Sequence, residues 1–135
     1  MECMFYACSS LKELNLTNFN TNKVTNMGAM FSGCSLLKKL NISNFNTNKI
    51  EDMSEMFQNC SSLTSLDLSH FKTNNVERMQ SIFAGCSSLK DLNISNFNLD
   101  NILNKDSLCE ILNGCTDELK MKVNQFDNFK NIEFD

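Results

Sequence analysis

The chain has 135 residues, with 12 basic and 16 acidic side chains and a net charge of −4 at neutral pH. This length predicts one domain, and the near balance of charge disfavours nucleic-acid binding, which needs clustered cations, whereas the only arginine is Arg78. No apolar run approaches the roughly 20 residues that span a bilayer, and no signal-peptide pattern is present. Both a cytosolic protein and a mature piece of an exported protein remain open.

A unit of 26 residues repeats along the chain almost unchanged. Three columns of residues show this spacing: Cys8, Cys34, Cys60 and Cys86; Phe19, Phe45, Phe71 and Phe97; and Leu14, Leu40, Leu66 and Leu92. Self-similarity at such a period indicates stacked supersecondary units, each of which buries its apolar side against its neighbours. We therefore predict an α/β solenoid, with a short parallel sheet on one face and short helices on the other.

The chain opens in the helical part of a unit, because Met1 and Met4 correspond to Met27 and Met30. No polar capping element precedes these residues, although solenoids usually have caps at both ends. We expect either a truncated fragment or an N-terminal face that meets another chain.

Within each unit a strand is expected first. Leu40 and Ile42 alternate with polar residues, which is the pattern of a strand with one buried face. The Ser43–Phe45 segment turns the chain and directs an aromatic ring inward. Stacked copies would place leucines under the sheet and the Phe19, Phe45, Phe71 and Phe97 rings in a spine.

A short helix is expected next. Asn48 and Glu51 have the spacing of a helix capping box, and apolar residues recur at helical spacing as far as Cys60. The helices should end at one repeated position that suits a left-handed backbone, occupied by Gly33, Asn59, Gly85 and Gly114. The methionines of these segments are expected to fill the core, the alternative being a soft-metal or peptide-binding surface.

Seven cysteines raise the question of disulfides. Because most of them share one repeat position, we expect buried free thiols there, with Cys115 joining the column. A bridge between neighbouring copies remains open, since strand spacing is compatible with one. Cys3 and Cys109 lie outside the column and are expected to be exposed.

The regular pattern ends after Phe97. We divide the chain into tandem repeats at 1–104 and a degenerate last repeat with a C-terminal cap at 105–135. A three-residue insertion before Cys115 places Met121 and Val123 on the strand positions, so a fifth strand is predicted at 119–123. Degenerate terminal repeats are typical of solenoid ends.

The outward side of the predicted sheet is the candidate binding site. Repeat proteins commonly bind partners through an extended sheet surface. Twelve residues are assigned to this face: Glu13, Asn15, Thr17, Lys39, Asn41, Ser43, Ser65, Asp67, Ser69, Asp91, Asn93 and Ser95. The fifth strand would add Lys120, Lys122 and Asn124. The alternative interpretation is a solvated sheet with ladders of Asn and Ser, because no aromatic anchor is present.

A column of Lys12, Lys38 and Lys90 beside this face indicates either acidic partners or a solvated edge. Catalytic, cofactor-binding and metal-ligating residues are not identified. His70 is the only histidine and replaces the asparagine of the other units, so we interpret it as a turn residue. A catalytic triad or a zinc site would need such a residue to converge with partners in one pocket.

The full pattern C-S-S-L-x-x-L-x-L-x-x-F-x-T-x-x-V-x-x-M-x-x-M-F-x-G-C resembles the BspA-like leucine-rich repeat proteins, closely over residues 1–98 and loosely to about 126. The resemblance implies a leucine-rich-repeat solenoid and display at a cell surface or secretion. It also implies a non-enzymatic module for adhesion or protein binding, with a host or extracellular-matrix protein as partner. The family has no catalytic residues to transfer.

Two alternatives belong to other classes. The first is structural self-association, in which uncapped solenoid ends stack into a homodimer, because exposed strand edges and apolar cross-sections pair readily. The second is an intracellular scaffold or effector, which differs in compartment. No membrane insertion is expected.

Overall fold

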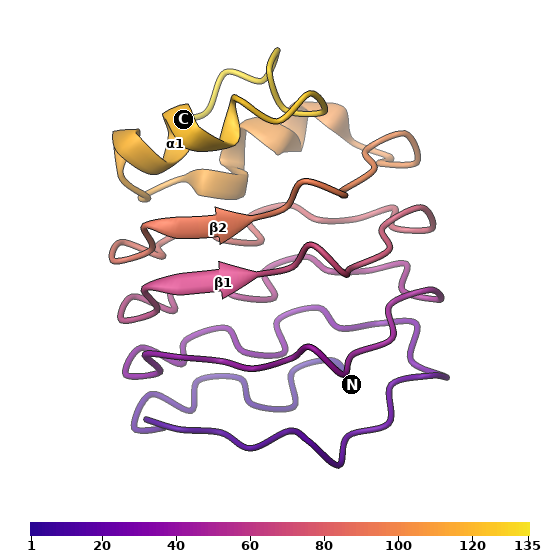
Figure 1. Ribbon diagram of the computed structural model, residues 1–135, viewed down its shortest axis with the longest axis vertical. Coiled ribbons are helices and arrows are strands. Elements are labelled where there is room, and N and C mark those ends of the chain that lie inside the picture. The colour runs from indigo at the N-terminus through magenta and orange to yellow at the C-terminus, as the bar shows by residue number, and fades with distance from the viewer.

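The computed structural model describes residues 1–135 and contains four short regular elements (Figure 1). These are strand β1 (Ser65–Asp67), strand β2 (Asp91–Asn93), the 3-10 helix η1 (Lys105–Leu112) and the α-helix α1 (Asp117–Val123). The two strands form a parallel sheet in which Ser65 pairs with Asp91 and Asp67 with Asn93. Most of the remaining chain consists of turns and loops.

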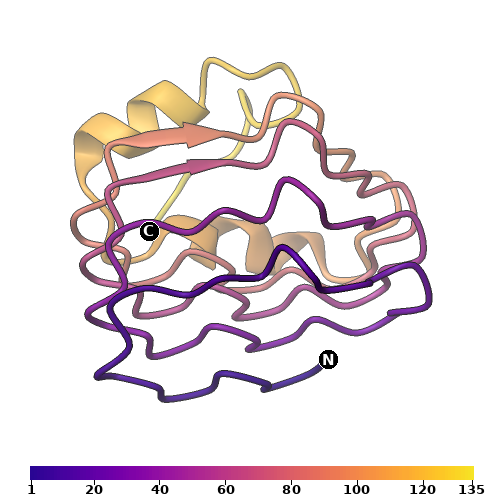
Figure 2. The same ribbon diagram turned by 60° about the horizontal axis from the view of Figure 1, so that its bottom comes forward.

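The predicted α/β leucine-rich-repeat solenoid is wrong. The sheet has only two strands of three residues each, and both helices lie after residue 104, so no repeat contains a helix. What the chain shows instead is a series of irregular turns lying one above another, with the N-terminus at one end (Figures 1 and 2). The 26-residue register is seen where neighbouring turns touch, as in the parallel bridges that join Asn26 to Asp52 and Asp52 to Arg78.

The expected helices do not form because their backbone N–H groups are used between turns. Ala29 N donates to Ser54 O at 2.8 Å and Phe31 N donates to Met56 O at 2.9 Å. Every second N–H group therefore bonds to the next turn and is not available for the hydrogen bond to residue i−4 that an α-helix requires. Ala29 also has a φ of 50°, which a right-handed helix does not allow. Successive tight turns bury the apolar residues that are spaced three and four positions apart, as a helix would.

The predicted left-handed positions do exist, although they end turns rather than helices. Gly33, Asn59, Gly85 and Gly114 have φ values of 77°, 57°, 74° and 74°. An ideal Cβ built on Gly85 would lie 2.2 Å from Asn59 Oδ1, so the glycine also permits close approach of adjacent turns. The sequence signal for a special backbone conformation was therefore correct at all four sites.

Aromatic stacking follows a different column from the predicted spine. Consecutive rings of Phe5, Phe31, Phe57 and Phe83 lie nearly parallel, with centroids 5.6, 5.7 and 5.8 Å apart. Phe45, Phe71 and Phe97 are buried as expected and Phe19 is only half-buried, but the rings of this column do not stack on one another. The stacked rings lie in the methionine-rich layer, where Met27, Met30, Met53, Met56 and Met79 are buried. Core filling by the methionines is confirmed.

The cysteine column is also buried from the second turn onward. Cys34, Cys60, Cys86 and Cys115 are buried free thiols, and each donates its Sγ–H to the backbone carbonyl of a phenylalanine in the preceding turn, at 3.1–3.3 Å. Cys8 and Cys3 are exposed, whereas Cys109 is half-buried rather than exposed. No disulfide joins neighbouring turns.

The predicted fifth strand is wrong as well. Residues 117–123 form α1, which begins where Thr116 Oγ1 accepts a hydrogen bond from Leu119 N at 3.3 Å. Glu118 and Lys122 form an i,i+4 ion pair of 2.9 Å, and acidic residues precede basic ones as the helix dipole favours. Leu119 and Val123 are buried, whereas Met121, expected inside, is 64% exposed. The helical spacing of Leu119 and Val123 and the Thr116 cap therefore favour a helix over the strand that the repeat register predicts.

Candidate binding face

The twelve predicted face residues all lie at the surface. Ten are exposed, and Ser69 and Asn93 are half-buried. Only those near 65–69 and 91–95 adjoin regular strands, since the corresponding earlier segments are not assigned as strand. The face does not extend onto a fifth strand, because Lys120, Lys122 and Asn124 belong to α1 and its C-cap.

Asparagine and aspartate side chains in this face are held by local hydrogen bonds. Asn41 Oδ1 accepts from Ser43 N at 3.1 Å and from Ser43 Oγ at 2.8 Å, and Asn15 makes the same two bonds with Thr17. Asp67 Oδ1 accepts from Ser69 N at 2.9 Å. These turns orient the side chains before any partner arrives, and the amide nitrogens of Asn15 and Asn41 remain free to donate.

The charge of Asp67 is favoured by the same turn. Hydrogen bonds from the Ser69 backbone and side chain, with His70 nearby, hold the pKa of Asp67 below its ordinary value. The face therefore carries a fixed anion between rows of carboxamide and hydroxyl groups.

Two hollows lie along the face. The first has a volume of about 690 Å³ and is lined by Glu13, Lys39 and Asn41 together with Lys12, Leu14, Leu36 and Lys38. The second, of about 630 Å³, includes Ser65, Asp67, Asp91 and Asn93 in its lining. Seven of the twelve predicted residues thus line a concave surface, in the size range of ligand sites.

The two hollows differ in charge. In the first, the side chains of Lys12, Lys38 and Lys39 form no ion pair or hydrogen bond within the chain. In the second, Lys122 is neutralised by Glu118 and also donates to Lys90 O at 3.2 Å. The predicted Lys12, Lys38 and Lys90 column is consequently divided between a basic hollow and a mixed one.

His70 takes the structural position of the asparagine that it replaces. Its Nε2 donates to Ile42 O at 3.1 Å, just as Asn44 Nδ2 donates to Leu16 O at 3.0 Å one turn earlier. The ring also packs edge-on against Phe71. Both groups join adjacent turns, which agrees with the interpretation of His70 as a turn residue.

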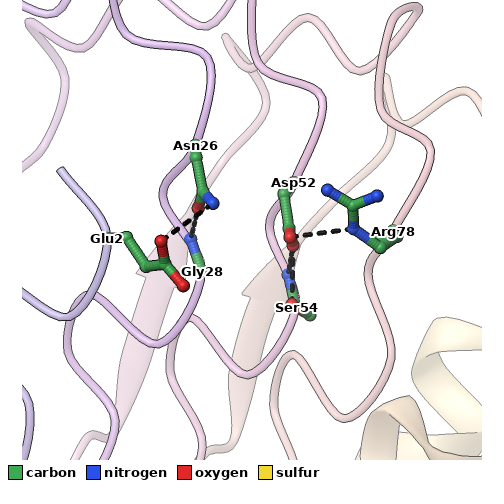
Figure 3. A network of polar contacts seen from close by, with 6 residues as sticks. All are labelled: Glu2, Asn26, Gly28, Asp52, Ser54 and Arg78. Carbon is green, nitrogen blue, oxygen red and sulfur yellow. Dashed lines mark hydrogen bonds and ion pairs between the residues drawn. The ribbon is translucent and has the colours of Figure 1, made fainter.

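Sequence reasoning missed a polar network on another side of the molecule (Figure 3). Asp52 Oδ1 accepts from Ser54 N and Oγ at 2.9 and 2.6 Å, while Asp52 Oδ2 accepts from Arg78 Nε at 2.9 Å. Burial opposes ionisation of Asp52, but the bonds from Ser54 and Arg78 outweigh it and lower its pKa. One turn away, Asn26 occupies the position of Asp52 and donates to Glu2 Oε2 at 3.2 Å.

This network stabilises the stack of turns rather than forming a site. All buried side-chain polar atoms of the chain have hydrogen-bond partners, so none is left aimed at a ligand. The signal that could have revealed it is the substitution series Asn26, Asp52 and Arg78 at one repeat position, where an acid and a base become neighbours if copies stack.

The threonines at one position of the repeat form a second contact between adjacent turns. The sequence pattern includes these threonines but does not reveal their role. Thr47 Oγ1 donates to Lys72 O at 3.2 Å and accepts from Lys72 N at 2.7 Å, and Thr21 and Thr73 bond the next turn in the same way. All three are buried. They position the loops that follow the candidate face.

A family model described as "Mycoplasma protein of unknown function, DUF285" matches residues 1–126. The chain belongs to the DUF285 family. This DUF285 match covers the whole candidate face, the Asp52 network and α1. No curated protein and no solved structure matches the chain. No helix in this DUF285 protein is long and apolar enough to cross a membrane.

Proposed function

We propose that this DUF285 protein is a non-enzymatic module that binds another protein through the exposed face of residues 13–17, 39–43, 65–69 and 91–95. The observation that supports the proposal most directly is that seven of the twelve face residues line two hollows of about 690 and 630 Å³. Concave surfaces with pre-oriented polar groups bind partners at a lower ordering cost than mobile ones do. Adhesion, and action at a cell surface or after secretion, rest on the resemblance to BspA-like proteins.

The experiment compares two serine variants that change charge and size equally. Ser65 lies on the face and lines the second hollow, whereas Ser87 is exposed outside the face. Neither side chain makes a hydrogen bond in the chain, so Ser65→Arg and Ser87→Arg are both expected to fold. Binding to a panel of immobilised extracellular-matrix proteins is measured by surface plasmon resonance.

We expect Ser65→Arg to weaken binding at least about tenfold, because a long charged side chain would fill the centre of a recognition surface, where truncations and intrusions cost most. Ser87→Arg should bind as the wild type does. Equal binding by the two variants, or no binding to any panel member by the wild type, would contradict the proposal.

A second candidate function, self-association, is supported by the first turn. Met4 is 47% and Tyr6 59% exposed, whereas Met30 and Ser32, their counterparts one turn on, are buried. The carbonyl groups of Glu2, Met4 and Tyr6 accept no backbone hydrogen bond, although the corresponding carbonyls of Gly28, Met30 and Ser32 do. Helices η1 and α1 cover the opposite end of the stack (Figure 1).

Light scattering over a range of concentrations tests self-association. A dimer that is lost in Tyr6→Glu, but kept in Ser87→Arg, would support pairing through the first turn. A monomer at all concentrations would exclude it.

The intracellular alternative differs in redox compartment and has its own test. Titration of native protein isolated from its source should find seven reduced thiols if the compartment is reducing. Cell fractionation measures the location directly, and recovery in the cytosol would contradict display at the surface.

A further inference from the structure

The first hollow of the candidate face combines unpaired cations with exposed apolar side chains. Lys12, Lys38 and Lys39 line it without an ion pair, against the single carboxylate of Glu13. Leu36 is 44% exposed and Leu14 is half-buried in the same lining. Of the residues that correspond to Leu14, Leu40 is also half-buried, whereas Leu66 and Leu92 are buried.

The local charge has the opposite sign to that of the whole chain, which carries a net charge of −4. Like charges that crowd one concave surface repel each other, and a bound anion relieves this repulsion. At physiological ionic strength the Debye length is about 8 Å, so this attraction acts between groups in direct contact and weakens as the salt concentration rises. The lysines therefore provide a site for carboxylates rather than for cations.

The leucines restrict the ligand further. Exposed apolar area in the lining of a polar hollow is stabilised when another apolar group covers it and removes it from water. A simple anion would leave Leu14 and Leu36 in contact with water, and a purely apolar ligand would leave the lysines without counter-charges. A ligand that carries both an anionic group and an apolar group would pair with the lysines and cover the leucines.

We propose that this hollow binds an acidic peptide segment of a partner protein, with an aliphatic side chain on Leu14 and Leu36 and flanking carboxylates on Lys12, Lys38 and Lys39. The proposal rests on the proposed function, since it assigns the partner's chemistry to one part of the binding face. The second hollow would not select an acidic segment, because its lysines are offset by Asp67, Asp91 and the Glu118 pair.

Three synthetic peptides with one leucine test the chemistry: one flanked by glutamates, one by lysines and one by serines. Isothermal titration calorimetry with the full chain should detect binding of the glutamate peptide alone. Its affinity should fall at least about tenfold when ionic strength rises from about 0.05 to about 0.5 M, as the screening length shortens. Binding of the lysine peptide with equal affinity would overturn the proposal.

Matched variants locate the binding. Lys38 lines the hollow, whereas Lys49 is exposed elsewhere and also forms no ion pair. Lys38→Glu and Lys49→Glu change the net charge equally, so only a local effect distinguishes them. We expect Lys38→Glu to weaken glutamate-peptide binding at least about tenfold and Lys49→Glu by less than about twofold, consistent with a contact that is short compared with the Debye length. Leu36→Ser should weaken the leucine peptide but not a glutamate peptide with alanine in its place.

The outcomes separate this proposal from the general one. Loss of matrix-protein binding in Ser65→Arg, with no glutamate-peptide binding or equal effects of the two lysine variants, would refute the acidic ligand and leave the face proposal intact. Conversely, selective loss of peptide binding in Lys38→Glu, with unchanged matrix binding in Ser65→Arg, would support the hollow and contradict the wider face.

Discussion

The rings of Phe31 and Phe57 lie face to face, with centroids 5.7 Å apart and planes inclined by 11°, although 25 residues separate them in the chain. Both rings are fully buried, and each also stacks on a ring of the turn beyond. Adjacent turns are thus held by repeated side-chain contacts as well as by backbone hydrogen bonds.

Removing one ring should strongly destabilise the protein. Phe57→Ala would leave a cavity between two rings and is expected to lower the free energy of unfolding by about 3–5 kcal/mol. Phe57→Leu fills most of the volume and should cost clearly less. Urea unfolding followed by circular dichroism measures both, and a loss below about 1 kcal/mol for Phe57→Ala would show that neighbouring turns do not depend on this stack.

Alkaline conditions should destabilise the fold through the buried thiols. Burial, together with the neighbouring cysteine of the column, raises the pKa of Cys34 to about 11 and of Cys60 to about 12. A raised folded pKa means that the stability is fully present below the unfolded pKa of about 8.5 and is lost as pH rises toward the folded value. Urea unfolding at about pH 7.5 and at about pH 10 tests this prediction, and we expect a lower free energy of unfolding at the higher pH.

The variant Cys60→Ala provides the control for the thiol prediction. It should show a smaller loss of stability between the two pH values than the wild type, because one of the titrating buried groups is gone. An unchanged dependence on pH would contradict the assignment.

Acid should act in the opposite direction through Asp52. Because hydrogen bonds from Ser54 and Arg78 keep its folded pKa low despite burial, its contribution is present above the unfolded pKa of about 3.9 and is lost as pH falls through the folded pKa. Asp52→Asn keeps an oxygen for Ser54, as Asn26 does for Gly28, but loses the ion pair with Arg78.

The measurement is the midpoint of urea unfolding from pH 6 down to about pH 3, below the ordinary aspartate pKa. We expect a shallower decline for Asp52→Asn than for the wild type. Asp127→Asn, at a carboxylate that is 97% exposed, serves as the matched control and should decline as the wild type does. Parallel curves for the wild type and Asp52→Asn would rule out the proposed linkage.

Close approach of turns at Gly85 should make that position intolerant of side chains. Gly85→Ala places a Cβ 2.2 Å from Asn59 Oδ1 and 3.3 Å from Asn59 Cα, at a φ of 74°. The left-handed backbone alone costs an alanine about 1–2 kcal/mol, and the contact adds to that cost. Adding Asn59→Gly removes the contact with the side chain and should recover part of the loss. Equal stability of the single and double variants would show that the contact with the Asn59 side chain does not contribute to the loss.

The repeat spacing predicted most of the buried residues, because a fixed period places equivalent side chains in equivalent environments, although Cys8 is exposed and Leu14 and Leu40 are only half-buried. Leu16, Phe45, Met53 and Cys60 are all inside, and the left-handed sites at Gly33 and Asn59 were recognised from residue type. The exposed position of the twelve face residues followed from alternation within the predicted strands. The hollows along that face did not, because they depend on how far Leu36 and the lysines project.

The amino-acid sequence by itself determined the period, the buried columns and the exposed polar face of this DUF285 protein. Only the tertiary structure decided that the apolar segments are tight turns instead of helices, that residues 117–123 leave the register as α1, and that Arg78 reaches Asp52. The physical reason is competition for backbone donors. An N–H group such as that of Ala29 can serve its own turn or the next one, and apolar spacing is the same in both cases.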